Sequence, residues 1–232
     1  MSLYQSVADD LRDRILSGRF APGDRLPAET ELCTEYGVSR STVREALRAL
    51  ANQNLVVTAR GVSGGTFVAL PKASDIRAYL ENSLGLLTFH DEVPIEALLE
   101  ARDVLEVPAA GMAAERADAD ALAALRDTLV DVESTDFDRI QECNHLFHAL
   151  LVQASGNPLL EVVTRPVFSI LVSRSVREPV VDNAYWSIVV DDHRHIFEAV
   201  EAGDAEGARQ RMRAHLDRLR ATYASGLPGG PA

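Results

Sequence analysis

The first 70 residues limit the possible folds most, because short helical and strand patterns follow one another there in a fixed order. The apolar spacing predicts helices over residues 2–17, 27–36 and 40–52 and strands over residues 55–60 and 66–68. Gly37 ends the second helix and Ser39 can cap the third, so the two helices meet in a tight turn. The predicted order is therefore helix, helix, glycine turn, helix and then a hairpin.

This order of elements is that of a winged helix-turn-helix, whose third helix enters the major groove of DNA. In the helix over residues 40–52, apolar residues at helical spacing predict the side that faces the core; they are Val43, Ala46, Leu47 and Leu50. Arg40, Arg44 and Arg48 recur every four residues and form a stripe on another side. Arginine can bind phosphate or donate two hydrogen bonds to guanine. The alternative is a solvated amphipathic helix whose arginines pair with Glu45 and other surface acids.

Two further groups complete the expected DNA contacts. Ser41 and Thr42 lie at the N-terminal end of the third helix, where their hydroxyls can reach phosphate. Arg60 and Gly61 lie at the tip of the expected hairpin, where a guanidinium group is attracted into the minor groove and glycine allows close approach of the backbone. We therefore predict double-stranded DNA as a partner. We also expect a homodimer on a palindromic operator, because a single small module makes few contacts.

The charge distribution is compatible with DNA binding by the N-terminal region alone. Residues 1–71 contain eight Arg and eight Asp or Glu, so the net charge of −12 lies entirely in residues 72–232. No apolar run approaches the roughly 20 residues of a membrane span, and the N-terminus has no signal pattern. Cys33 and Cys143 are too few for a disulfide framework. We expect a cytoplasmic protein with two free thiols and no membrane partner.

The remainder of the chain has helical period almost throughout. We expect a domain boundary near residues 70–74, with a winged helix-turn-helix domain over residues 1–71 and an all-helical domain of six or seven helices over residues 72–232. The Gly- and Pro-rich end, residues 225–232, predicts a disordered tail. The predicted fold class is therefore mainly α: a winged helix-turn-helix with a small β-hairpin, followed by a helical bundle.

Polar residues on apolar helix faces are the informative feature of the second domain. His148, His193 and His215 lie on three separate helices among apolar neighbours, and Asn144 precedes His148 by one turn. Three imidazoles and an amide oxygen are a possible ligand set for Zn²⁺, Ni²⁺ or Mn²⁺ that leaves coordination positions open. The alternative is a metal-free core in which the histidines bond to one another, to Asn144 and to water. Two further histidines are expected at the surface, His90 and His145.

A charged pair in the second domain has two interpretations. Arg102 and Glu106 are four residues apart on one expected helix and are most simply a helix-surface ion pair. If Arg102 points inward instead, its guanidinium group can hold a carboxylate with two hydrogen bonds. Arg102 is therefore the residue that we expect to bind an acidic effector.

The N-terminal stretch resembles the GntR family of bacterial regulators over about residues 5–69. The residues that carry the resemblance are GDRLPAE (23–29), Leu32, YGVSRSTVREAL (36–47) and Leu50. The positions that contact the operator in that family match Arg40, Ser41, Thr42, Arg44 and Gly61. Many members with a FadR-type second domain have arginine where this chain has Thr30, so a DNA contact from that position is expected to be absent or weaker.

The C-terminal part resembles the FadR-type ligand-binding domain called FCD over about residues 75–222. The resemblance rests on residues 100–106, 144–148, 155–158, 192–194, 199–204 and 212–216. In metal-binding members, a divalent metal is held by the residues that match Asn144, His148, His193 and His215. The first of these is commonly Asp, so Asn144 removes one negative charge and a strong ligand. Members bind small carboxylates at or beside the metal, and the arginine that matches Arg102 often lies near that pocket.

These patterns and resemblances predict a ligand-responsive transcriptional regulator, most often a repressor in this family, and not an enzyme. An enzyme that activates water on a three-histidine metal is the first alternative, but no obvious general base accompanies the histidines. An architectural DNA-binding protein is the second alternative, but buried imidazoles without partners would be costly in a purely structural domain. Because imidazole binds metal only when neutral, we expect metal affinity to fall below about pH 6.

Overall fold

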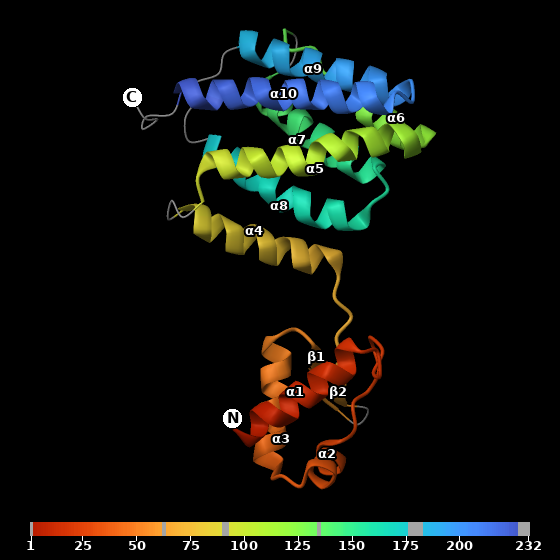
Figure 1. Cartoon of the computed structure of the whole chain (residues 1–232), viewed down its shortest axis with the longest axis vertical. Coiled ribbons are helices and arrows are strands. Elements are labelled where there is room, and N and C mark those ends of the chain that lie inside the picture. Colours follow the sequence, from red (N-terminus) through yellow and green to blue (C-terminus); the bar gives the residue numbers. More distant parts are fainter. Residues whose placement is uncertain (1, 62–63, 90–92, 134–135, 176–182, 227–232) are drawn as a thin grey trace. The chain divides into compact units, whose positions relative to one another are not determined.

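The protein is described by a computed structural model that covers residues 2–61, 64–89, 93–133, 136–175 and 183–226. Within these residues the chain forms ten helices and one two-stranded antiparallel sheet (Figure 1). It divides into two compact units, Met1–Lys72 and Ala73–Ala232. The mainly helical class with one small hairpin is the one that the sequence predicts.

The N-terminal unit contains three helices and the hairpin, in the expected order. The elements are α1 (Leu3–Leu16), α2 (Glu29–Tyr36), α3 (Arg40–Asn52), β1 (Val56–Ala59) and β2 (Gly65–Val68). In the hairpin Val56 lies opposite Val68, and both are buried. The turn between the strands includes residues 62–63, which lie outside the described residues.

The turn between α2 and α3 follows from two residues. Gly37 has φ +63°, in the left-handed region that glycine adopts without steric cost, and it ends α2. Ser39 then caps α3, because its side-chain oxygen accepts a hydrogen bond from the backbone N–H of Thr42 at 3.2 Å. These two local features fix the point at which α3 begins.

The core of the N-terminal unit decides which side of α3 faces solvent. The apolar residues of α3 that were expected to face inward are buried: Val43, Ala46, Leu47 and Leu50. They pack with Val7 and Leu11 of α1 in one apolar cluster. Since this side is occupied, the arginine stripe of α3 lies on the exposed surface.

The C-terminal unit is a bundle of seven helices within the described residues. They are α4 (Ala73–Phe89), α5 (Ile95–Arg116), α6 (Ala119–Arg126), α7 (Phe137–Ala154), α8 (Pro158–Ser175), α9 (Asn183–Glu201) and α10 (Ala205–Gly226). In Figure 1, α10 lies between α9 and α5, and α8 lies between α5 and α4. No helix in the described part of the chain is long and apolar enough to span a bilayer.

Two boundaries differ from the sequence prediction. Spacing around His193 alone predicts a helix from about Asp191, but α9 begins at Asn183, and Trp186, Val189 and Val190 also pack into the core. The expected disordered tail begins at Ser225, whereas α10 continues to Gly226. The rest of that tail, residues 227–232, lies outside the described residues.

Candidate functional site

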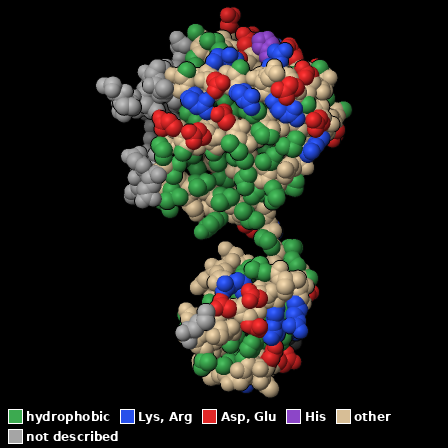
Figure 2. Space-filling model, viewed as in Figure 1, with side chains coloured by type: hydrophobic (Ala, Val, Ile, Leu, Met, Phe, Trp, Pro, Cys, Tyr) green, Lys and Arg blue, Asp and Glu red, His purple; other side chains and the backbone are tan. Residues whose placement is uncertain are grey.

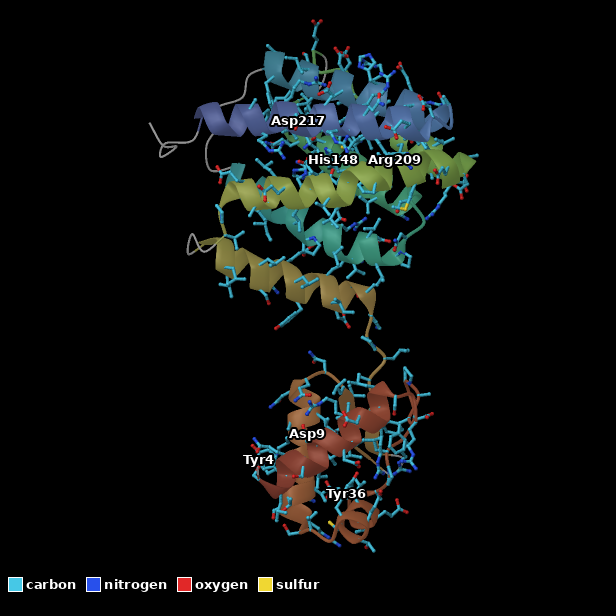
Figure 3. The ribbon with its side chains drawn as sticks, in the orientation of Figure 1. Tyr4, Asp9, Tyr36, His148, Arg209 and Asp217 are labelled. Carbon is cyan, nitrogen blue, oxygen red and sulfur yellow. The ribbon has the colours of Figure 1, made fainter. Side chains whose placement is uncertain are left out.

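Three buried imidazoles meet inside the C-terminal bundle. His148 comes from α7, His193 from α9 and His215 from α10, and each side chain is at most 2% exposed. Each offers one ring nitrogen to a group in which all three atoms lie within 4.8 Å of one another. Figure 3 labels His148 in the interior between α5 and α10. The structure therefore brings together three side chains from distant parts of the sequence.

Two nitrogens of this His cluster (His148, His193 and His215) lack hydrogen bonds. Nε2 of His193 and Nε2 of His215 are buried and bond to no described residue. Phe147 stacks on the ring of His193 with centroids 4.0 Å apart, so the ring is held in place by an apolar contact. A buried lone pair without a donor costs free energy, and a divalent metal would satisfy it. The residues present therefore fit a metal.

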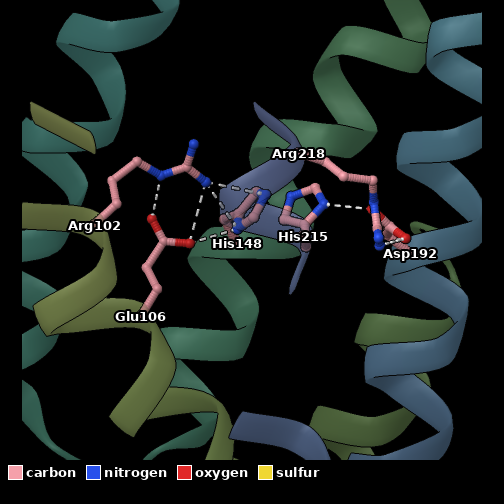
Figure 4. Close-up of polar contacts among 6 residues, drawn as sticks. All are labelled: Arg102, Glu106, His148, Asp192, His215 and Arg218. Atoms are coloured by element: carbon pink, nitrogen blue, oxygen red, sulfur yellow. Dashed lines mark hydrogen bonds and ion pairs between the residues drawn. The ribbon is translucent and has the colours of Figure 1, made fainter. Parts of the chain in front are cut away.

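Arg102 and Glu106 lie in the same interior, so the expectation of a helix-surface pair is wrong. Their side chains are 2% and 0% exposed, because this side of α5 packs against α7, α8 and α10. Arg102 donates from Nε to Glu106 Oε1 at 2.6 Å and from Nη2 to Oε2 at 3.2 Å. Glu106 Oε2 also accepts from Nδ1 of His148 at 2.7 Å. One buried carboxylate is thus shared by an arginine and an imidazole (Figure 4).

A second carboxylate has the same arrangement on the other side of the His cluster. Asp192 of α9 lies 3.2 Å from Nδ1 of His215, through Oδ2. The same carboxylate accepts two hydrogen bonds from Arg218 of α10, one of them from Nε at 2.8 Å. In Figure 4 the His cluster residues His148 and His215 lie between these two carboxylate–arginine pairs.

The environment keeps the imidazoles neutral and the carboxylates ionised. Burial lowers the pKa of His148 to about 4, although the Glu106 carboxylate opposes that shift. Burial also lowers the pKa of His193 and of His215. For Glu106, burial would raise the pKa, but Arg102 and His148 outweigh it and hold the pKa well below its usual range. Burial likewise opposes ionisation of Asp192, and the hydrogen bonds from His215 and Arg218 lower its pKa.

Other residues singled out from the sequence have these positions. Asn144 is half-buried on α7, one turn before His148. His145 is half-buried rather than at the surface, because its ring packs edge-on against Phe168 at 5.4 Å. His90 lies outside the described residues. Both cysteines are free thiols, with Cys143 buried and Cys33 half-buried.

The exposed side of α3 carries the arginine stripe. Arg44 and Arg48 are 60% and 74% exposed, and Arg40 is also exposed. Arg44 donates from Nε to Glu29 at the start of α2, at 2.9 and 3.2 Å, and Arg48 pairs with Glu45 at 2.8 Å. The ion pairs that a solvated helix would make are therefore present, and geometry alone does not decide between the two interpretations of the stripe.

The remaining residues of the expected DNA surface also lie at the surface. Ser41 is exposed and Thr42 half-buried at the start of α3, and the hydroxyls of both lie within 2.9 Å of Oγ of Ser39. Arg60 and Gly61 are exposed at the end of β1. Gly61 has φ +111°, which side chains rarely adopt, so glycine is needed there.

Comparison with known proteins shows which family the chain belongs to. The model of "Bacterial regulatory proteins, gntR family" matches residues 3–68, and the model of the FCD domain matches residues 97–218. The HTH-type transcriptional regulator LutR of Bacillus subtilis (strain 168) is 33% identical over 208 residues, covering 87% of this chain and 92% of that protein. The chain belongs to the GntR family.

Two further comparisons give a second relative and a solved structure with the same fold. The galactonate operon transcriptional repressor of Escherichia coli (strain K12) is 30% identical to this GntR-family chain over 86% of it and 87% of that protein. The solved structure of Streptococcus agalactiae GntR shares the fold, with a TM-score of 0.51 and 24% identity over 94% of this chain and 99% of that one.

Family membership settles the broad function class. The protein is a transcriptional regulator of the GntR type with an FCD domain, and GntR-family regulators bind DNA operators. The metal-enzyme alternative is set aside, because the relatives are regulators and not enzymes. Their names, regulator and repressor, also speak against a purely architectural DNA-binding protein.

Two sets of contacts could not be predicted from the sequence: the bond of Glu106 to His148 and the bonds of Asp192 to His215 and Arg218. Glu106 was paired with Arg102, but its bond to His148 joins residues on different helices. Asp192 stands next to His193 in the chain, yet it bonds to His215, 23 positions later. The sequence offered one signal for these contacts: Glu106 and Asp192 are each an ionisable residue on an otherwise apolar helix face.

Proposed function

We propose that this GntR-family protein is a homodimeric, cytoplasmic repressor whose affinity for a palindromic operator is controlled by a small carboxylate. Residues 1–71 would be the DNA-binding domain, and residues 72–232 the effector-binding and dimerisation domain. The name of the galactonate operon repressor supports repression as the output.

A divalent metal, Zn²⁺, Ni²⁺ or Mn²⁺, would be held by His148, His193 and His215, with Asn144 as a fourth ligand. The observation that carries this proposal is the pair of buried Nε2 atoms without hydrogen bonds. The metal would tie α7, α9 and α10 together and act as a Lewis acid toward an effector.

The charge of the ligand set supports an acidic effector. Three imidazoles and an amide are all neutral, so they leave the two positive charges of the metal uncompensated. The nearest carboxylates, Glu106 and Asp192, each already neutralise an arginine. A carboxylate in the open positions would supply the missing charge, and Arg102 lies beside His148 to receive its second oxygen.

The contacts to DNA would come from α3 and the wing. The proposed residues are Arg40, Ser41, Thr42, Arg44, Arg60 and Gly61, all at least partly exposed. Thr30 is exposed on α2, and because its side chain carries no positive charge we expect no strong contact from it to DNA phosphate.

An exposed apolar stripe supports the dimer. On α4, Ile76, Tyr79 and Leu86 lie at helical spacing and are 41%, 68% and 66% exposed, and Val104 on α5 is 73% exposed. Figure 2 shows hydrophobic side chains gathered on this side of the C-terminal unit, over α4 and α5. Contiguous exposed apolar surface of this kind is typical of a protein interface.

Metal analysis tests the proposal. Protein purified without a histidine tag is analysed for bound metal, and its melting temperature is measured with added Zn²⁺, Ni²⁺ or Mn²⁺ and a panel of organic acids. We expect bound metal in the wild type, none in His193→Ala, and wild-type content in His195→Ala, since His195 is exposed on the same helix. The proposal of a bound metal that receives the effector would be overturned by one result: no metal in either wild type or His193→Ala, and no effect of added metal on the melting temperature or on binding of the acids.

A further inference from the structure

Two buried carboxylates lie beside the His cluster and are not among the proposed metal ligands. Glu106 and Asp192 come from different helices, α5 and α9, yet each makes the same pair of contacts. Each accepts from Nδ1 of one imidazole, His148 or His215, and from one arginine. Such repeated geometry calls for a common explanation.

We propose that Glu106 and Asp192 are positioning residues that hold His148 and His215 with the proton on Nδ1 and the lone pair of Nε2 directed to the metal. This inference rests on the proposed metal site. A carboxylate accepts hydrogen bonds and cannot donate them, so the imidazole nitrogen that faces it must carry the proton. The other nitrogen is then the acceptor, and in His215 that atom is the buried Nε2 without a hydrogen bond.

The arginines explain why these partners are carboxylates. The Asp192 carboxylate receives Arg218 at both oxygens and His215 at Oδ2. An amide in its place would turn its NH₂ group toward a donor in either orientation, since one side faces Nη2 of Arg218 and the other faces Nε and the imidazole. Only an acceptor on both sides satisfies all the donors and fixes the tautomer.

Arg102 does not take over the metal-binding nitrogen of His148. Its Nη2 lies 3.4 Å from Nδ1 and 3.3 Å from Nε2 of that ring. Because the two distances are nearly equal, Nη2 lies along the lone-pair direction of neither nitrogen. Its charge is neutralised by Glu106, so the repulsion that an approaching metal ion would meet is reduced.

Asp192→Asn is the most informative variant, because Arg218, the other partner of this carboxylate, is 51% exposed and can be solvated. The matched control is Asp191→Asn, which removes the same charge from the preceding, exposed residue of α9. Zn²⁺ affinity is measured by competition with a chromogenic chelator, and folding by the melting temperature without metal. We expect about 10–100-fold weaker Zn²⁺ binding for Asp192→Asn and a wild-type value for Asp191→Asn. Equal affinity in wild type and Asp192→Asn would overturn the inference.

A second measurement separates this inference from the metal proposal. Nitrogen-15 NMR of the metal-free wild type reports which ring nitrogen of each histidine carries the proton. We expect Nδ1–H for His148 and His215, and a shift of His215 toward Nε2–H in Asp192→Asn. Nε2–H in both wild-type rings would overturn the inference even if metal binds. If the wild type binds no Zn²⁺ but shows the expected tautomers, the metal proposal fails and the positioning by the two carboxylates stands.

Discussion

At the level of single residues, Arg44 is the side chain of α3 on which the DNA-binding proposal depends most. It is exposed, and its Nε is held by Glu29. We predict that Arg44→Ala costs about 1–3 kcal/mol in operator binding, because a base or phosphate contact is lost. Titration of a labelled operator measures the loss. Arg19→Ala, which removes the same charge from an exposed position outside α3, should cost less. A folded Arg44→Ala variant with unchanged affinity would contradict the assignment.

Glu29, the partner of Arg44, gives a second prediction at this scale. Two explanations of its role predict opposite changes in operator affinity when its charge is removed. Removing a carboxylate near DNA should strengthen binding if charge alone matters. If Glu29 instead holds Arg44 ready for contact, Glu29→Gln frees the guanidinium group and binding to the operator should weaken several-fold. Glu45→Gln removes an equal charge beside Arg48 and serves as the control. Stronger operator binding by Glu29→Gln would show that Glu29 does not position Arg44.

The buried imidazoles give a pH dependence of stability. The pKa of His148 is about 4 in the folded protein and about 6.5 when unfolded, so the unfolded chain binds more protons between these values. Stability of the metal-free protein should therefore fall as the pH drops from about 6.5 toward 4, by about 3 kcal/mol for His148 alone. His193 and His215 add to this fall, since burial lowers the pKa of both.

Urea unfolding in EDTA at several pH values measures this effect. His195→Gln, an exposed control, should behave as the wild type. Stability that stays constant between pH 6.5 and 5 would contradict neutral buried imidazoles. The loss of metal affinity below about pH 6 stays a prediction. Because burial lowers the pKa of His148 to about 4, we expect protons to compete with metal at this ring mainly toward the lower end of that range.

At the level of elements, the start of α3 depends on one cap. Ser39 accepts from the backbone N–H of Thr42, and its hydroxyl also contacts those of Ser41 and Thr42. We predict that Ser39→Ala destabilises this end of α3 by about 1 kcal/mol. Hydrogen exchange of the α3 peptide in the full chain should be faster in Ser39→Ala and unchanged in Ser6→Ala, an exposed control on α1. Equal exchange rates in Ser39→Ala and wild type would argue against the cap.

At the level of the whole molecule, the net charge is unevenly divided along the chain. The N-terminal 71 residues have no net charge, and residues 72–232 carry the whole excess of −12. If the arginine surface of α3 contacts DNA as proposed, the acidic C-terminal unit should be repelled by the DNA phosphates. Linkage also requires reciprocity: an effector that weakens operator binding must itself bind less tightly to the protein on DNA, by the same factor.

The dimer is a prediction at this scale. Tyr79→Asp combined with Leu86→Asp places two charges on the exposed apolar stripe of α4 and should convert the dimer into monomers. Operator affinity should fall with it, because half of the contacts of a palindromic site are lost. Ile188→Asp, at an exposed apolar residue of α9, is the control. Sedimentation velocity and footprinting measure both effects, and a wild type that is monomeric on an asymmetric site would contradict the prediction.

The local sequence was sufficient to predict those features of the structure that depend only on residues close together in the chain. Gly37 ends α2 and Ser39 caps α3 as expected, because both effects act within four residues. The apolar spacing of α3 also predicted its buried side correctly. On the three helices of the bundle, the same spacing showed that His148, His193 and His215 point inward.

Only the tertiary structure decided which inward faces meet. Spacing along α5 placed Arg102 and Glu106 on one side of that helix but could not tell whether this side was buried, and the surface interpretation was wrong. The partners of the imidazoles lie 42 positions away for His148 and 23 for His215, so no local pattern joins them. Helix packing sets these contacts, because burial in a common core brings distant side chains within hydrogen-bond distance and makes their pairing necessary.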